Sequence, residues 1–98
     1  MTITMTRNES ELIVAVEGRL DTLTSPELEE KLEPALKDVK KLIFDFAQLR
    51  YISSAGLRVL LTAMQVMEEQ GEMIVRNVSD DIMDVFEVTG FAEDLNFE

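Results

Sequence analysis

Cysteine and histidine are both absent from this chain of 98 residues. The lack of cysteine excludes disulfides and thiolate chemistry, and it agrees with a reducing compartment. Without either residue, a serine triad, a cysteine protease and most zinc sites cannot be built. The sequence also has no phosphate-binding glycine-lysine loop, no GxSxG motif and no twelve-residue calcium loop. These absences predict a protein that is not an enzyme and that holds no metal or cofactor.

Long hydrophobic runs are missing as well. The longest apolar stretches fall far short of the roughly 18 residues that a membrane-spanning helix needs. The first residues, Met1 to Thr6, alternate as a strand does and do not form the apolar core of a signal peptide. We therefore expect a cytoplasmic protein that does not associate with membranes.

Basic residues are few, with 20 acids against 9 bases and a net charge of −11. A negative field of this size repels nucleic acid, so DNA and RNA are not expected partners. The same field favours encounter with a partner that carries a basic face. A simpler interpretation, in which the acidity only keeps a small protein soluble, stays open at this point.

The order of the periodic segments predicts an α/β (α+β) fold in one domain, residues 1–98. Two alternating segments joined by a turn indicate a β-hairpin, and two later β-α-β units make the sheet mixed. The predicted strands are residues 2–7, 11–17, 42–46 and 73–78, with a possible short strand near 95–97, which gives a four- to five-stranded sheet. The predicted helices begin at Ser25, Ser54 and Ser79.

Several local features of these elements are also predicted. Residues Gly18 to Asp21 are expected to leave the sheet after the second strand. Ser25, or alternatively Thr24, is the expected cap of the first helix. Pro34 lies inside the amphipathic pattern of this helix, and we expect it to kink the helix rather than end it. Gly71 is expected to end the second helix in a left-handed conformation.

The second predicted helix, residues 54–69, has an unusually wide apolar arc. Its polar side chains form only one narrow stripe, which consists of Arg58, Thr62, Gln65 and Glu69. A helix that lies on one face of a sheet usually needs a narrower arc than this. Either neighbouring elements flank the helix, or one of its edges docks on something else.

The start of this helix carries two adjacent hydroxyls, Ser53 and Ser54. A serine at such a junction can accept a bond from an unpaired backbone N–H and cap the helix. The same position suits a phosphate, because unpaired N–H groups and the positive end of the helix dipole lie there. With no base to activate it, an exposed serine is better interpreted as a modification switch than as a nucleophile. A plain cap at Ser54 is the structural alternative.

Four segments together resemble the STAS domain, and more narrowly the stand-alone anti-sigma factor antagonists. They are Gly18-Arg-Leu-Asp21, the helix opening at Ser25-Pro26, Tyr51-Ile-Ser-Ser-Ala-Gly-Leu57, and Val85-Phe-Glu-Val-Thr-Gly-Phe91. The resemblance covers the whole chain and implies helices packed mainly on one face of the sheet. It also implies that Ser54 is the phosphoacceptor and that Gly56 is the glycine of the motif. Ser53 departs from the family, which usually has an acid at this position, and the departure leaves two adjacent hydroxyls for a kinase to choose between, with Ser53 the less expected acceptor.

The resemblance further implies a partner-switching role. The unphosphorylated chain would bind an anti-sigma factor that is also a serine kinase of the histidine-kinase-like ATPase fold, and so release the sigma factor. Phosphorylation would break that complex, and a PP2C-type phosphatase would restore it; ATP and magnesium would belong to the kinase. We expect a monomer whose partner-binding residues are Asp21, Asp45, Ser53, Ser54, Gly56, Leu57 and Arg58.

The sequence leaves two other functions open. A catalytic or nucleotide-handling domain would have to rely on a carboxylate pair such as Asp21 and Asp45, because the usual motifs are missing. A second alternative keeps the fold and the switch but changes the circuit, so that the chain regulates a phosphatase, a sensor complex or another partner that is not a sigma factor.

Overall fold

A computed structural model describes residues 1–98 as six strands and four helices. In chain order the elements are β1 (Thr2–Asn8), β2 (Glu11–Leu20), α1 (Ser25–Ala35), β3 (Lys41–Asp45), β4 (Leu49–Ile52), α2 (Ser54–Gln70), β5 (Glu72–Arg76), α3 (Asp80–Thr89), α4 (Phe91–Asp94) and β6 (Asn96–Phe97).

The strands form one mixed sheet. Its order is β1-β2-β3-β5-β6, and β4 pairs with the end of β2 outside this path. β1 and β2 are antiparallel, as the predicted hairpin requires, and all the other pairs are parallel. The predicted fold class is therefore confirmed, but the sheet has six strands rather than four or five. The additional strand is β4, which is too short to show a period of its own in the sequence.

The second strand is longer than predicted, because the chain does not leave the sheet at Gly18. This glycine has a φ of +93°, and the pairing register between β2 and β4 shifts between Gly18 and Arg19. Such a bulge bends a strand and increases its twist without ending it. The strand then continues to Leu20, which pairs with Ile52 of β4. The expectation that Gly18 to Asp21 leaves the sheet is wrong, because the chain leaves it only at Asp21. The pairing of β2 with β4 fixes the position of the site described below.

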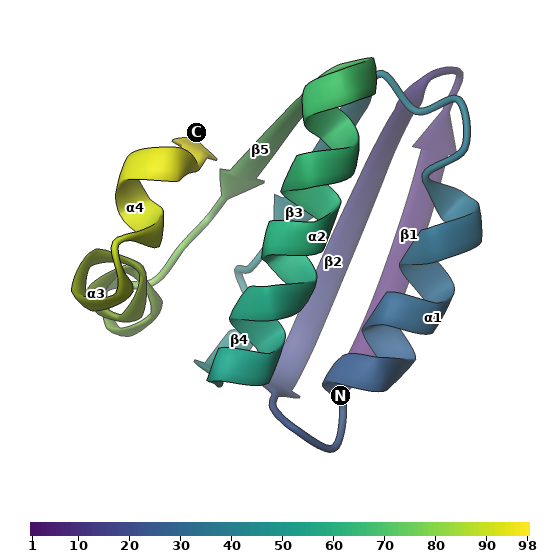
Figure 1. Ribbon diagram of the computed structural model, residues 1–98. Helices are drawn as coiled ribbons and strands as arrows, with labels where there is room; N and C mark the ends of the chain where they lie inside the picture. The colour runs from purple at the N-terminus through teal and green to yellow at the C-terminus, as the bar shows by residue number, and fades with distance from the viewer.

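The core lies between the sheet and the helices. Leu12, Val14 and Val16 alternate along β2 and are buried, as the sequence predicts. Figure 1 shows α1 and α2 lying side by side across one face of the strands, with α3 and α4 beyond the β5 side. Ile82 and Phe86 of α3 belong to the same core cluster as the strand residues. The helices are thus packed mainly on one face, as expected.

β3 is the central strand, between β2 and β5. Its residues Leu42, Ile43 and Phe44 are all buried, although they alternate between the two faces of the sheet. The predicted burial on both faces is confirmed.

No helix of the structure combines the length and the apolar character that crossing a bilayer requires.

The ends of two helices differ from the prediction. α1 ends at Ala35, directly after Pro34, so the expected kink is wrong. Proline has no N–H and removes one bond of the ladder; the N–H of Leu36 still donates to the carbonyl of Leu32 at 3.0 Å, and the helix ends there. Gly71, at the end of α2, has a φ of 178° and is extended rather than left-handed. A glycine is nevertheless required there, because a Cβ atom would collide with the carbonyl group of Lys40.

The contact between Gly71 and Lys40 gives a test of the fold. Gly71→Ala forces the two backbone segments apart, and we expect it to lower the free energy of unfolding by about 2 kcal/mol or more. Urea unfolding followed by circular dichroism measures this loss. Gln65→Ala, at an exposed position of the same helix, is the control and should change stability by less than about 0.5 kcal/mol. Equal stability of the two variants would contradict the close contact between Gly71 and the carbonyl group of Lys40.

Candidate functional site at the start of helix α2

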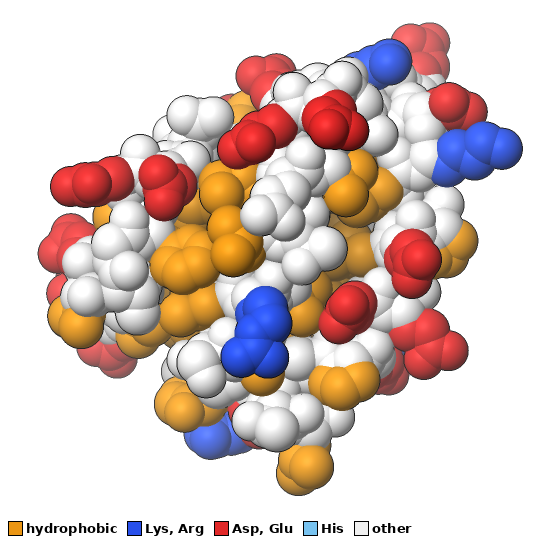
Figure 2. Space-filling view, in the orientation of Figure 1, with side chains coloured by type: hydrophobic (Ala, Val, Ile, Leu, Met, Phe, Trp, Pro, Cys, Tyr) orange, Lys and Arg blue, Asp and Glu red, His pale blue; other side chains and the backbone are white.

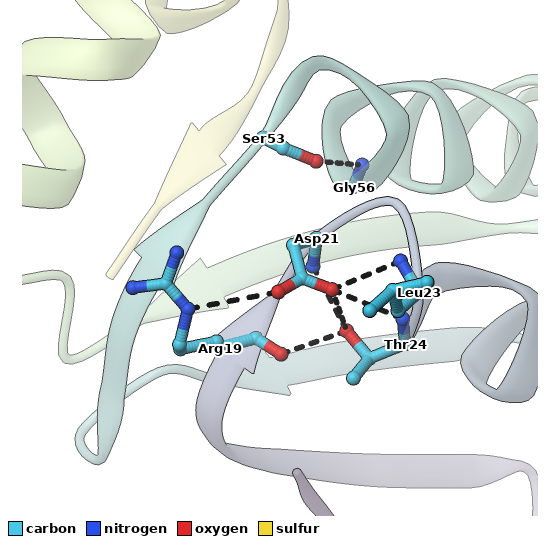
Figure 3. A network of polar contacts seen from close by, with 6 residues as sticks. All are labelled: Arg19, Asp21, Leu23, Thr24, Ser53 and Gly56. Atoms are coloured by element: carbon cyan, nitrogen blue, oxygen red, sulfur yellow. Dashed lines mark hydrogen bonds and ion pairs between the residues drawn. The ribbon is translucent and has the colours of Figure 1, made fainter.

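Ser53 connects β4 to α2 and caps the helix. Its backbone is extended, with φ −97° and ψ 177°, and its Oγ accepts a hydrogen bond from the N–H of Gly56 at 3.4 Å (Figure 3). Its own N–H donates to the carbonyl oxygen of Leu20 at 2.9 Å, and its carbonyl accepts from the N–H of Leu57 at 3.0 Å. The first turn of α2 is therefore attached directly to the end of β2.

Ser54 is the first residue of α2, and its side chain is exposed. Its hydroxyl takes part in none of the hydrogen bonds of the structure, since Ser53 supplies the cap. The alternative role for Ser54, a plain N-cap, therefore does not apply. A hydroxyl at this position is free to react and lies at the positive end of the helix dipole, where a phosphate is stabilised.

Gly56 allows the first turn of α2 to rest on the sheet. A Cβ atom at this position would lie 2.8 Å from side-chain atoms of Leu20 and Ile52, and 2.9 Å from the carbonyl oxygen of Leu20. Real Cβ atoms do not approach other atoms this closely, so any other residue would push the helix away from β2. Gly56 is itself buried, so it supports the serine pair without being accessible to a partner.

Asp21 orders the loop between β2 and α1, beside the same junction. Its carboxylate accepts from the N–H groups of Leu23 and Thr24 at 3.0 and 3.1 Å, and it lies 3.6 Å from Nε of Arg19 (Figure 3). The bond from the Thr24 backbone, helped by Leu23, the Thr24 hydroxyl and the charge of Arg19, outweighs desolvation and lowers the pKa of Asp21 below its ordinary value of 3.8. Asp21 is therefore ionised at neutral pH and holds this loop in place.

No side chain caps α1, and the loop before the helix is held by other bonds. Thr24 occupies the N-cap position but makes no capping bond with its side chain. Its hydroxyl instead accepts from the N–H of Asp21 at 2.8 Å and donates to the carbonyl of Arg19 at 2.7 Å. Ser25 is buried and its Oγ has no hydrogen-bond partner. The predicted cap by Ser25 is wrong, and the loop bonds of Asp21 and Thr24 stabilise the helix start in its place.

Arg19 and Tyr51 also belong to the site, although the sequence did not predict that they contact each other. They are register partners on β2 and β4, and the guanidinium carbon of Arg19 lies 4.1 Å from the centre of the Tyr51 ring. Arg19 thus contacts Tyr51 by a cation–π interaction while it also faces Asp21. Only the pairing of β2 with β4 brings the two residues together, and no local pattern in the sequence predicts that pairing.

Asp45 is not part of this group. It follows Phe44, whose side chain enters the core, so alternation directs its carboxylate to the other face of the sheet. There it accepts from the side chain of Asn77 and the N–H of Ala47, both at 3.1 Å, and lies 3.7 Å from Nε of Arg76. Desolvation raises the pKa of Asp45, but these bonds and the charge of Arg76 outweigh it and lower the pKa overall.

Leu57 and Arg58 separate into different roles. Leu57 is 4% exposed and packs in the core directly below the serine pair. Arg58, one turn after Ser54, is exposed and forms no ion pair. The structure therefore brings Asp21, Ser53, Ser54 and Arg58 to the accessible part of one edge, with Gly56 and Leu57 supporting them from inside. What the arrangement offers chemically is the exposed hydroxyl of Ser54 at the start of α2, where the helix dipole favours a negative group.

The chain is thus a small α/β domain with a mixed sheet, helices mainly on one face, and an exposed serine at the start of α2. The family model for the STAS domain matches residues 2–98 of the chain. The chain therefore belongs to the STAS domain family.

Relatives and solved structures are similar over nearly the whole chain. BtrV of Bordetella bronchiseptica, assigned as an anti-sigma factor antagonist, is 36% identical over 93 residues, which are 93% of this chain and 80% of BtrV. An anti-sigma factor antagonist from Mycobacterium paratuberculosis superposes with a TM-score of 0.88 at 20% identity, covering 98% of this chain and 83% of that one. The antagonist SpoIIAA in its unphosphorylated form has a TM-score of 0.78 at 20% identity, covering 99% and 87%. SpoIIAA has also been solved in a phosphorylated form, again with a TM-score of 0.78, at 21% identity and covering 99% and 91%.

The separation of the two serine roles can be tested by stability. Ser53→Ala removes the side chain that accepts from Gly56, and we expect it to lower the free energy of unfolding by about 1 kcal/mol. Ser54→Ala removes a hydroxyl without partners, so it should leave stability within about 0.5 kcal/mol of the original. Urea unfolding of both variants measures the difference. A larger loss from Ser54→Ala than from Ser53→Ala would show that the cap has been assigned to the wrong serine.

The bonds of Asp21 predict a dependence of stability on pH. Because the folded-state pKa of Asp21 lies below its unfolded value, the ionised carboxylate stabilises the fold above that value and loses this effect as the pH falls through the folded pKa. Asp21→Asn should therefore be less stable than the original chain at neutral pH, and the gap should close as the pH falls below about 3.8. Urea unfolding at a series of pH values measures this gap, and a gap that does not change with pH would contradict the assignment.

Proposed function

We propose that this chain is an anti-sigma factor antagonist that acts by partner switching, with Ser54 as its phosphoacceptor. The observation that carries the proposal is the free, exposed hydroxyl of Ser54 at the start of α2, next to a separate cap at Ser53. The name of BtrV and membership of the STAS domain family support the same role. Phosphate could thus be added or removed without unfolding the first turn of the helix.

The partners follow from this role. In the proposal, the unphosphorylated chain binds an anti-sigma factor that is also a serine kinase with a histidine-kinase-like ATPase fold, and the sigma factor is released. A PP2C-type phosphatase removes the phosphate and restores binding. In the proposal the chain acts as a monomer. It is the substrate of the kinase and not an enzyme itself, and the ATP and magnesium of the reaction are bound by the kinase.

Electrostatics explain how one phosphate can control this binding. A phosphoryl group brings nearly two negative charges to a position beside the ionised Asp21 loop. In the free chain, water and the N–H groups at the start of α2 stabilise the dianion. In a closed interface the dianion loses its water and stands next to a like charge, which is strongly unfavourable. A loss of about 3 kcal/mol lowers affinity more than a hundredfold, which is enough for a switch.

The accessible edge defines the contact residues. We propose that Ser53, Ser54 and Arg58 touch the partner, and that Asp21 does so from the adjoining loop. Gly56 and Leu57 are buried, so their part is to hold the first turn of α2 in position. Asp45 lies on the other face of the sheet and would contribute only through its bonds to Asn77 and Arg76.

The proposal predicts opposite effects for two changes at one residue. Ser54→Ala should bind the anti-sigma factor whether or not ATP is present, because it cannot be phosphorylated. Ser54→Asp places a charge in the interface and should bind at least about a hundredfold more weakly, the equivalent of about 3 kcal/mol. Titration calorimetry with the purified anti-sigma factor measures both affinities.

Ser53→Ala is the matched control, since it changes the neighbouring hydroxyl and leaves Ser54 available. After incubation with the kinase and ATP, mass spectrometry should find a single phosphate on Ser54 in the original chain and in Ser53→Ala. A phosphate on Ser53 alone would move the switch to that residue. Normal binding by Ser54→Asp, together with no phosphate on either serine, would refute the mechanism.

A further inference from the structure

An apolar groove runs between α1 and α2 on the helical side of the molecule. Its volume is about 300 Å³, and five of the residues that line it are hydrophobic: Leu32, Leu36, Val59, Ala63 and Val66. Val66 is 38% exposed although it is a large aliphatic residue. The groove therefore accounts for one edge of the wide apolar arc of α2, the edge that carries Val59, Ala63 and Val66.

The rim of the groove is acidic. Glu29 and Glu33 line it from α1, Thr62 lines it from α2, and no lysine or arginine is among the lining residues. Figure 2 shows hydrophobic side chains in the hollow between α2 and α1, with acidic side chains along the α1 side. An occupant that matches this surface has an apolar ridge and positive charges beside it.

The groove extends to the candidate site. A second hollow shares Glu29 and Val59 with it and continues past Arg58 to Ala55, the residue that follows Ser54 in the first turn of α2. From residue 55 to residue 66 the length along α2 is about 16 Å at 1.5 Å per residue. This length accommodates about three turns of another helix.

We propose that the α1–α2 groove docks an amphipathic helix of a protein partner, with its apolar face on Val59, Ala63 and Val66 and its lysine or arginine residues beside Glu29 and Glu33. Helices with apolar residues at spacings of three and four bind grooves of this kind. The net charge of −11 favours approach of a basic segment. The identity of the partner, the anti-sigma factor, rests on the proposed function, whereas the groove itself does not.

The docking surface can be tested with a defined probe. The probe is a synthetic amphipathic peptide of about 18 residues, five helical turns, in which leucines occupy one face and lysines the other. A peptide of the same composition in scrambled order controls for simple charge attraction. In spectra of the isotope-labelled full chain, the ordered peptide should shift the amides of Thr62, Ala63 and Val66 and bind at least tenfold more tightly than the scrambled one. Equal affinity for both peptides would overturn the proposal.

Two pairs of variants locate the binding. Val66→Glu places a charge in the groove and should weaken binding at least tenfold, whereas Val88→Glu, on α3 and 87% exposed, should leave it unchanged. Glu33→Lys should weaken binding more than Glu30→Lys, which makes the same charge change on α1 away from the lining residues. A lysine at position 33 would lie in the last turn of α1, where the helix dipole favours a positive charge. Glu33→Lys is therefore not expected to unfold the chain, and weaker binding would not be due to unfolding. Equal effects within either pair would contradict the docking site.

The same variants, tested against the anti-sigma factor, separate this inference from the proposed function. If Ser54→Asp loses binding and Val66→Glu binds normally, the switch stands and the groove is not part of the interface. If Val66→Glu loses binding at least tenfold and Ser54→Asp binds normally, the groove is supported and the phosphorylation mechanism fails. Loss in both variants, with normal binding by Val88→Glu, supports both.

Discussion

The N–H of Ser53 donates to the carbonyl of Leu20, and this bond ties the start of α2 to the end of β2. The two segments are far apart in the sequence, and they meet only because the bulge at Gly18 allows β2 to continue and pair with β4. Gly56 permits the close contact, since a Cβ atom would press on Leu20 and Ile52. This junction determines where the serine pair and the Asp21 loop lie, and it brings Arg19 into contact with Tyr51.

The division of work between the two serines follows from the geometry of the helix start. Ser53 has the extended backbone of a cap, and its side chain accepts from the N–H of Gly56. Ser54 is already inside the helix, so its hydroxyl points to solvent without a structural task. A modification at Ser54 therefore changes charge without removing a bond that holds the helix. The proposed switch at Ser54 would therefore leave the cap of α2 intact in the phosphorylated and the unphosphorylated chain.

The acidic residues of the molecule fall into two groups, those that accept hydrogen bonds within the fold and those that line its surface. Asp21 and Asp45 are both held by backbone and side-chain donors, which lower the pKa of each, but they share no bonding partner. Glu29 and Glu33, in contrast, are free on α1 and line an apolar groove. The net charge alone is compatible with simple solubility, whereas this uneven placement favours a partner with a basic face.

Local patterns in the sequence predicted the hairpin, the alternation along β2, the central strand and the position of Ser54 at a helix start, because hydrophobic periodicity and capping chemistry act over a few neighbouring residues. They could not show β4, the Arg19–Tyr51 contact, the burial of Leu57 or the face on which Asp45 lies. Each of these depends on pairing or packing between distant segments. The bulge at Gly18 and the end of α1 at Pro34 show the same limit, since a glycine or proline can bend or end an element, and only the surrounding contacts decide between these outcomes.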